Sequence, residues 1–246
     1  MNLMENLEPL VRKGTWYWNA DGKFTRLLPP AMDSNCNWIS SDLTFRCHKW
    51  HKIFWDLLTQ KSFVHSHCQE CYKVVLIPRS FAELLEVEAL QKRMADCKCG
   101  IDMREYTKHH YAAFWYNRGL DMAQGCYAEV RQWADDILGE DAIGKLPDVT
   151  IKRGCTEFEV QGTAGDSLHW CTGVQQNYIE QWLDSRLLFD PYDVMGQTED
   201  IRQLIRLKWM RWAYPHGDET YIPHNAHEPL YKSCRVYHEE AISNTH

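Results

Sequence analysis

The chain has 246 residues, of which 44% are hydrophobic and 25% are charged, and these proportions are typical of a folded globular protein. Its formal net charge of −7 excludes a protein that only coats nucleic acid, because such a protein carries a general excess of positive charge. A local basic patch is still compatible with this balance. The sequence contains no targeting signal and no run of membrane-spanning length, so we expect a cytoplasmic protein that does not enter a membrane.

The first predicted elements follow an irregular, aromatic-rich segment over residues 1–46, in which residues 19–22 form a turn. A short helix is expected at 48–60, and the β-branched apolar run at 72–77 predicts a strand. Ser80 and Glu83 have the spacing of a capping box, which predicts a helix that continues to about residue 94. Residues 97–100 should break this helix, and the alternation at 101–106 predicts a second strand.

The longest helix is expected at 116–138, where apolar residues recur with the helical period. Strand segments are expected at 150–152 and 158–160, helices at 174–188 and 198–213, and short strands at 220–222 and 236–238. This order predicts a single α+β domain in which a small mixed sheet packs among helices, and a split β-α-β sheet is compatible with it. Three parts are expected: the irregular segment 1–46, a cysteine-cluster part 47–147, and a carboxylate and helical part 148–246.

Ten cysteines are too many for a cytoplasmic chain without a special role, because disulfides are rare in that compartment. Cys68 and Cys71 form a C-x2-C pair that can direct two thiolates at one metal, and a second pair follows at Cys97 and Cys99. We expect Cys47, Cys68, Cys71 and Cys99 to be the ligands, with Cys97 as the substitute for Cys99.

The metal itself is expected to be a 4Fe–4S cluster, with zinc as the alternative. The second cysteine pair lacks the matched C-x2-C form of a zinc ribbon, and the aromatic residues nearby are suited to shield a cluster from solvent. The other cysteines, Cys155 among them, stand alone in the sequence and are expected to be core or site-lining thiols.

A pair of carboxylates gives the clearest candidate for acid–base chemistry. Glu157 and Glu159 point to one face if their segment is a strand, and paired carboxylates can move a proton or bind a cation; a solvated edge strand is the alternative. A glycine-rich segment at 162–166 follows and leads to His169 and Trp170. Such a loop can approach a ligand with its backbone, so both residues are candidate substrate-binding residues.

Two further groups combine positive charge with aromatic rings. Arg104, Tyr116 and Arg118 flank the Phe-Trp pair at 114–115, and this mixture suits a sugar, a base or a phosphate, although a helix end packed on the core would look alike. The helix expected at 198–213 carries basic residues beside two tryptophans and is either a phosphate-facing stripe or an ordinary solvated face. Its residues in this group are Arg202, Arg206, Lys208, Trp209, Arg211 and Trp212.

Four runs of the sequence together resemble a known family. They are residues 68–75 (CQECYKVV), 99–104 (CGIDMR), 116–120 (YNRGL) and 153–159 (RGCTEFE). They are similar to iron–sulfur, glycosyltransferase-like proteins of bacteriophage DNA-hypermodification clusters, and the resemblance covers about residues 45–238. It implies modification of a base in phage DNA, in the host-cell cytoplasm, with a sugar passing from a nucleotide-sugar donor to a hydroxymethylated pyrimidine.

The resemblance also implies roles for particular residues. Cys47, Cys68, Cys71 and Cys99 would hold the cluster. The site would be lined by Arg153 together with Glu157, Glu159 and Asp218, of which the three carboxylates are the candidate catalytic residues. Tyr221 lies in the same acidic turn as Asp218 and is grouped with the substrate-binding residues.

Two other classes of function compete with this hypothesis. The first is a non-enzymatic metalloprotein that binds a nucleic acid or a host protein, such as a phage counter-defence factor, and the acidic balance of the chain favours a protein partner. The second is a redox or radical enzyme. It ranks last because the C-x3-C-x2-C spacing of common radical enzymes is missing.

Overall fold

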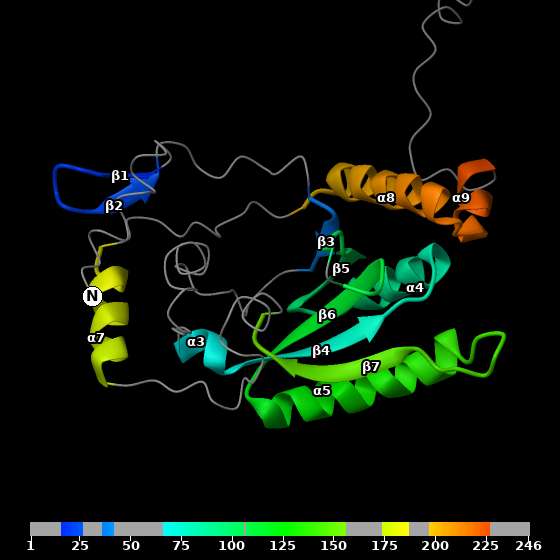
Figure 1. Ribbon diagram of the computed structural model, residues 1–246, viewed down its shortest axis with the longest axis horizontal. Helices are drawn as coiled ribbons and strands as arrows, with labels where there is room; N and C mark the ends of the chain where they lie inside the picture. The colour runs from blue at the N-terminus through cyan, green and yellow to red at the C-terminus, as the bar shows by residue number, and fades with distance from the viewer. Residues whose placement is uncertain are drawn as a thin grey trace, which may run out of the picture.

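The computed structural model describes residues 16–26, 36–41, 66–105, 107–155, 174–186 and 197–226. The centre of this part is a five-stranded sheet in which all neighbouring strands are antiparallel (Figure 1). In spatial order the strands are β3 (Trp38–Ser40), β5 (Cys97–Ile101), β6 (Tyr111–Arg118), β4 (Cys71–Ile77) and β7 (Asp148–Arg153).

Helices separate the strands along the chain. Helix α4 (Phe81–Gln91) connects β4 to β5, and α5 (Leu120–Trp133) connects β6 to β7. The order β4-α4-β5-β6-α5-β7, with β4 and β6 in the centre, is the split β-α-β arrangement of ferredoxin-like folds, and β3 extends the sheet beyond β5. The α+β class is therefore confirmed, and the arrangement matches the split β-α-β sheet. The expectation of a mixed sheet is wrong, because every pair of neighbouring strands in the described sheet is antiparallel.

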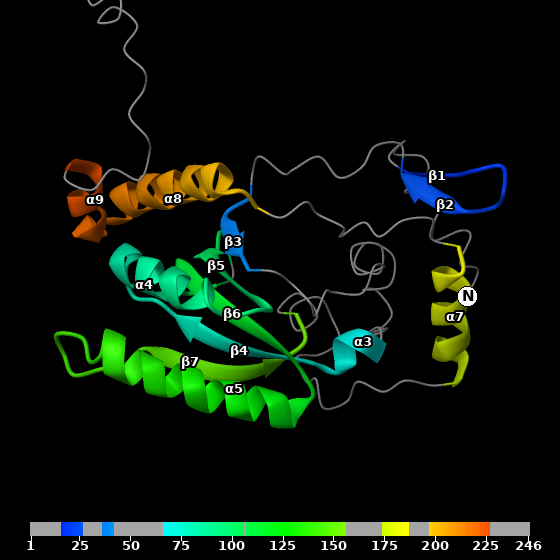
Figure 2. The same cartoon turned by 180° about the vertical axis from the view of Figure 1, so that it is seen from behind.

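One face of the sheet carries the main core. Helices α4, α5 and α8 (Glu199–Ala213) all contribute to a single apolar cluster on this face, and Figure 2 shows α4 and α5 in front of the strands. Trp115 of β6 and Trp209 of α8 are among its largest fully buried side chains. Because strand side chains alternate between faces, the residues adjacent to these core positions point to the opposite face of the sheet.

The start of α4 follows from its sequence. The Ser80 side chain accepts a hydrogen bond from the backbone N–H of Glu83 at 3.3 Å. The Glu83 carboxylate in turn accepts the backbone N–H of Arg79 at 2.7 Å and pairs with its guanidinium. These contacts satisfy donors that the first turn of a helix leaves without partners, and the predicted helix start is confirmed.

Three expected elements differ from the structure. The strand expected at 101–106 lies earlier, at residues 97–101 (β5), and residues 111–118 form strand β6, so the expected helix at 116–138 begins only at Leu120. Gly119, with φ of 85°, makes the turn between strand and helix. The strand expected at 220–222 is a 3-10 turn, η5 (Glu219–Tyr221), followed by the short helix α9 (Ile222–Ala226).

The remaining elements flank the sheet. A β-hairpin of β1 (Trp16–Trp18) and β2 (Phe24–Arg26) contains the predicted turn at 19–22, and Trp18 meets Trp182 of α7 (Val174–Asp184) edge-on at 6.4 Å. The elements expected at 48–60, 158–160 and 236–238 lie outside the described residues. Short elements complete the fold: α3 (Ser66–Gln69), the π-helical turn η2 (Ala134–Leu138) and η4 (Tyr214–His216).

None of the helices among the described residues combines the length and the apolar character that a membrane span requires.

Candidate functional site

The sheet face opposite the main core carries a second, smaller cluster of aromatic and basic side chains. The strand register places Trp38, Lys98, Phe114 and Tyr116 on this face, which we call the aromatic face. Its apolar centre consists only of strand residues, and within the described ranges no helix packs on it. In Figure 1 this face is turned toward the viewer.

The aromatic face is built around one lysine. The Lys98 ammonium lies 4.6 Å from the ring centre of Trp38, 5.5 Å from that of Phe114 and 6.0 Å from that of Tyr116. Trp38 and Phe114 are themselves in ring contact at 5.4 Å. Each cation–π contact contributes about 0.5–1 kcal/mol at an exposed site, so the rings hold the ammonium among themselves.

The rings differ in how accessible they are. Phe114 is only 6% exposed, because Trp38, Lys98 and a second lysine, Lys73, lie over it. Trp38 and Tyr116 are both half-buried. Phe114 therefore acts as the base of the cluster, while Trp38 and Tyr116 form its contact surface.

A pocket of about 320 Å³ opens beside this cluster. Trp38, Lys98 and Phe114 form one side, and the loop after β5 forms the other through residues 101–104. Arg104 lines the pocket, and its Nε donates a 2.7 Å hydrogen bond to the buried Asp102 carboxylate, which also accepts from the end of the guanidinium. Burial opposes ionisation of Asp102, but the hydrogen bonds and charge of Arg104 outweigh it and hold the pKa of this carboxyl below its usual value.

Positive charge predominates over the rest of the aromatic face. By alternation Arg118 lies on this face at the end of β6, and Lys73 and Lys152 lie opposite one another on β4 and β7. Arg118 is exposed, Lys152 is half-buried, and Lys73 is buried. Among the strand positions that the register assigns to this face, Asp148 is the residue with a negative charge. A chain of net charge −7 thus has a local surface of opposite sign.

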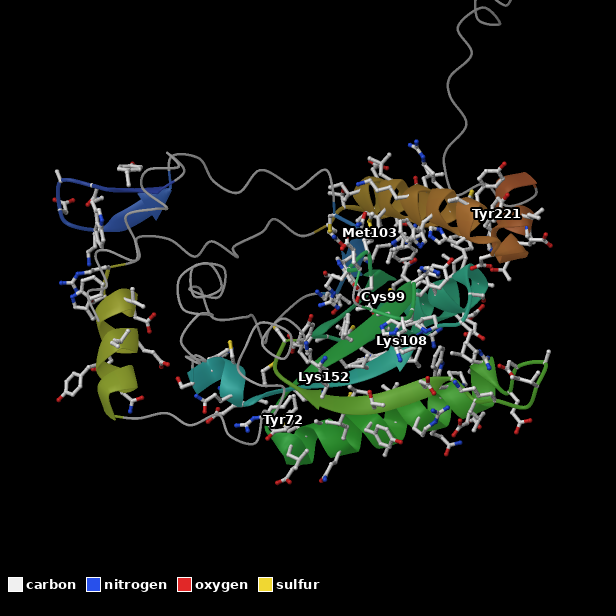
Figure 3. The ribbon with its side chains drawn as sticks, viewed as in Figure 1. Tyr72, Cys99, Met103, Lys108, Lys152 and Tyr221 are labelled. Atoms are coloured by element: carbon white, nitrogen blue, oxygen red, sulfur yellow. The ribbon has the colours of Figure 1, made fainter. Side chains whose placement is uncertain are left out.

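The cysteines expected to share one metal are separated by the register. Cys71 pairs with Arg118 and Cys99 pairs with Ala113, so they lie five positions apart along β6, about 17 Å. Two thiolates on one metal ion lie at most about 4.6 Å apart. Figure 3 shows Cys99 and Tyr72, the neighbour of Cys71, at different ends of the sheet. Cys71 and Cys99 therefore do not fit a common metal or a single cluster.

Cys97 and Cys99 are core residues. Both are 0% exposed, and burial raises the pKa of Cys97 to about 11 and that of Cys99 well above its usual value. The thiol of Cys97 lies 3.2 Å from the Ser41 hydroxyl and within hydrogen-bond range of the Gln91 carbonyl. Such surroundings favour the neutral thiol over the thiolate that ligates metal.

The C-x2-C pair lies at the other end of the sheet with an unexpected neighbour. Cys68 and Cys71 are buried, and the backbone N–H of Gly154 donates to the Cys71 carbonyl at 2.8 Å. This contact brings Cys155, which stands alone in the sequence, to the same end. Within the described ranges no three cysteine, histidine or acidic side chains converge as a metal site would require. Cys47 lies outside those ranges, so the 4Fe–4S cluster and the zinc alternative stay predictions.

Asp218 has a structural position. Its carboxylate accepts hydrogen bonds from the backbone N–H of Phe81 at 2.6 Å and from the Tyr111 hydroxyl at 2.7 Å. The N–H and hydroxyl of Thr220 also donate to it. Burial opposes its ionisation, but these donors outweigh it and lower the pKa of Asp218. Asp218 thus links the start of α4 to β6 and η5, and Tyr221 packs against the main core.

The other expected site residues do not lie together in the structure. Arg153 lies at the end of β7 beside the C-x2-C pair, where it donates to the Gln69 carbonyl at 2.6 Å and lies over the ring of Tyr72. Glu157, Glu159, His169 and Trp170 lie outside the described residues. The structure thus brings Arg104, Tyr116 and Arg118 to the aromatic face and does not bring Asp218, Arg153 or Tyr221 to it.

Two central members of the candidate site, Trp38 and Lys98, were not predicted from the sequence. Lys98 stands between two cysteines that drew attention to metal binding, and Trp38 lies in a segment with few helix or strand signals. The available signal for Lys98 in the sequence was its position between the apolar residues Cys97 and Cys99, an alternation that is typical of a strand.

Comparison with known proteins adds no assignment: no protein family model, no curated protein and no solved structure matches the chain.

Proposed function

We propose that the chain binds single-stranded nucleic acid on the aromatic face of its sheet. The observation that supports this most directly is the cluster of Trp38, Phe114 and Tyr116 around Lys98 on a face that lies opposite the helices. Aromatic rings stack on bases whatever their identity, and basic side chains beside them follow the backbone. RNA-recognition motifs use a four-stranded sheet in this manner.

The geometry favours unpaired bases over a duplex. Stacking on Trp38 or Tyr116 requires a base whose face is free, and the faces of bases in a duplex are covered by their neighbours. The pocket of about 320 Å³ beside Trp38 is at the lower end of the range for small-ligand pockets, about 300–1,000 Å³, which suits one flat group. Arg104 at its mouth can donate to a base edge or to a phosphate.

The charges set the expected strength and salt dependence of binding. Lys98, Lys152, Arg104 and Arg118 are the cations of the site that have exposed surface. If each contacts a phosphate, the slope of log K against log salt is about −2.8, since each contact with a single strand contributes about −0.7. Binding should therefore be strong at low salt and weaken steeply as salt rises.

Base modification is compatible with this proposal. An enzyme that acts on a base needs that base unpaired, and a single-strand surface would present it. The residues expected to carry that chemistry, Glu157 and Glu159, lie outside the described part of the chain. Sugar transfer to DNA from a nucleotide-sugar donor, the 4Fe–4S cluster and the cytoplasmic location, in the host cell if the protein is viral, stay predictions.

The test is fluorescence anisotropy of a labelled DNA oligonucleotide at low salt, with the same sequence as single strand and as duplex. We expect the single strand to bind more tightly. Tyr116→Ala should weaken binding by about 1–3 kcal/mol, the loss of one stacked base. Tyr178→Ala removes a ring that is 70% exposed on α7, away from this face, and should leave affinity unchanged.

Two results would contradict the proposal. One is a wild-type protein that binds no single strand at low salt. The other is a Tyr116→Ala variant that binds as well as Tyr178→Ala does. RNA of the same sequence serves as a comparison, and ring stacking by itself predicts a similar affinity for it.

A further inference from the structure

A second hollow adjoins the pocket of the aromatic face. It has a volume of about 410 Å³ and lies between the end of the sheet and helix α8. Both hollows are lined by Asn37, Ile101 and Met103, so they meet around these three residues. Met103 is 55% exposed, and Figure 3 shows it between the sheet and α8.

The second hollow repeats the chemistry of the first. On the α8 side it is lined by Lys208, Arg211 and Trp212, and the last two lie three and four positions after Lys208, so both neighbour it on the helix surface. Arg211 is exposed, and Lys208 and Trp212 are half-buried. The Trp212 ring stacks on His216 with centres 4.1 Å apart and planes at 22°. An aromatic surface with two cations therefore occurs a second time.

The two hollows are held in a fixed relation. The indole N–H of Trp209 donates to the Asn37 carbonyl at 2.8 Å, which attaches α8 to the residue before β3. The Asn37 side chain reaches the sulfur of Met103 at 2.8 Å, and the backbone N–H of Ile101 donates to the Asn37 carbonyl at 3.3 Å. Asn37 thus connects the strand, the loop after β5 and the helix.

We propose that a nucleic-acid strand on the aromatic face continues over Met103 into the hollow at α8. There Trp212 stacks a further base, and Lys208 and Arg211 contact phosphates. This inference rests on the proposed function and extends it, because it specifies the path along which the bound strand continues beyond the aromatic face. It also gives a role to Lys208 and Arg211, the two members of the basic group on α8 that line the hollow.

The experiment compares the wild type with three variants in salt titrations with a long and a short oligonucleotide. Lys208→Gln combined with Arg211→Gln should reduce the salt slope for the long strand by about 1.4, because two phosphate contacts are lost. Binding of a strand short enough to fill only the aromatic face should not change. Trp212→Leu should weaken binding of the long strand about fivefold or more.

The matched control removes the same charge elsewhere. Lys92→Gln with Arg93→Gln deletes two exposed cations at the end of α4, outside both hollows. If this variant lowers the slope as much as the α8 variant does, a general loss of charge explains the effect and the path over α8 is refuted.

The proposed function and its extension along α8 can be refuted separately. If Tyr116→Ala weakens binding while the α8 variant binds with the wild-type slope, the aromatic face binds and the extension is wrong. If neither variant changes binding, both the extension and the proposed function are wrong.

Discussion

Replacing Gly100 with alanine should either destabilise the fold or release strand β3, and release would remove Trp38 from the aromatic face. Gly100 pairs with Trp38 across the β3–β5 ladder. A Cβ atom at Gly100 would lie 2.1 Å from the Asn37 carbonyl oxygen and 3.0 Å from the Cα of Trp38. Because about 3.4 Å is an ordinary contact, Asn37 would have to retreat by roughly 1.3 Å.

The expected loss of stability follows from these contacts. Overpacking in a tight site costs about 1–3 kcal/mol. The retreat of Asn37 also breaks the hydrogen bond from the Trp209 indole, which adds about 1 kcal/mol. The free energy of unfolding should therefore fall by about 2–4 kcal/mol. Since β3 is a three-residue edge strand, the chain can instead release β3 and keep the rest of the fold.

The assay is urea denaturation combined with oligonucleotide binding. Gly125→Ala is the matched control, because Gly125 lies exposed in α5 and a Cβ atom there meets nothing within 4 Å. This control should be as stable as the wild type, or more stable by up to about 1 kcal/mol. Gly100→Ala should lower stability or, if β3 is released, lower affinity through the loss of Trp38. A Gly100→Ala protein that matches Gly125→Ala in both measurements would refute the register and the site built on it.

Three further predictions concern the core and the cysteines. Glu88→Gln leaves the buried Arg206 without its main partner and should cost about 3 kcal/mol in urea denaturation at pH 7; a loss below about 1 kcal/mol would contradict the buried ion pair. Asp218→Asn should destabilise the protein by about 1–3 kcal/mol at pH 7. Because the pKa of Asp218 is lowered in the fold, the carboxylate stabilises the folded state above its usual pKa of 3.8. This stabilisation is lost as the pH falls through the lower pKa of the folded state. The difference in stability between the variant and the wild type should therefore shrink below about pH 4 in acid denaturation. If the purified protein contains iron and sulfide, Cys71→Ser should lose them and Cys99→Ser should retain them, since the register separates these two residues; equal loss in both would show that they share a cluster.

Local sequence patterns predicted much of the fold. The β-branched run at 72–77, the cap at Ser80 and the apolar periodicity of 198–213 each specify an element through neighbouring residues, and the structure contains β4, α4 and α8 at these positions. The α+β class followed from their order. The sequence also grouped Arg104, Tyr116 and Arg118 by their residue types, and the structure places Tyr116 and Arg118 on the aromatic face and Arg104 in the pocket beside it.

The sequence misled where a local pattern has two interpretations. Residues 116–118 fit a helical stripe together with the residues after them, but they complete strand β6 because β4 and β5 pair with it on both sides. Cys97 and Cys99 look like half of a metal site in the sequence. In the fold they are core residues of β5, since their side chains point toward the helices.

The sequence by itself determined the local elements and the kinds of side chain near the site. Only the tertiary structure decided which of these side chains share a face and which lie apart. The physical reason is that strand side chains alternate with a period of two, so the pairing register sets the face of every residue. That register gathers Trp38, Lys98 and Tyr116 from three strands and separates Cys71 from Cys99.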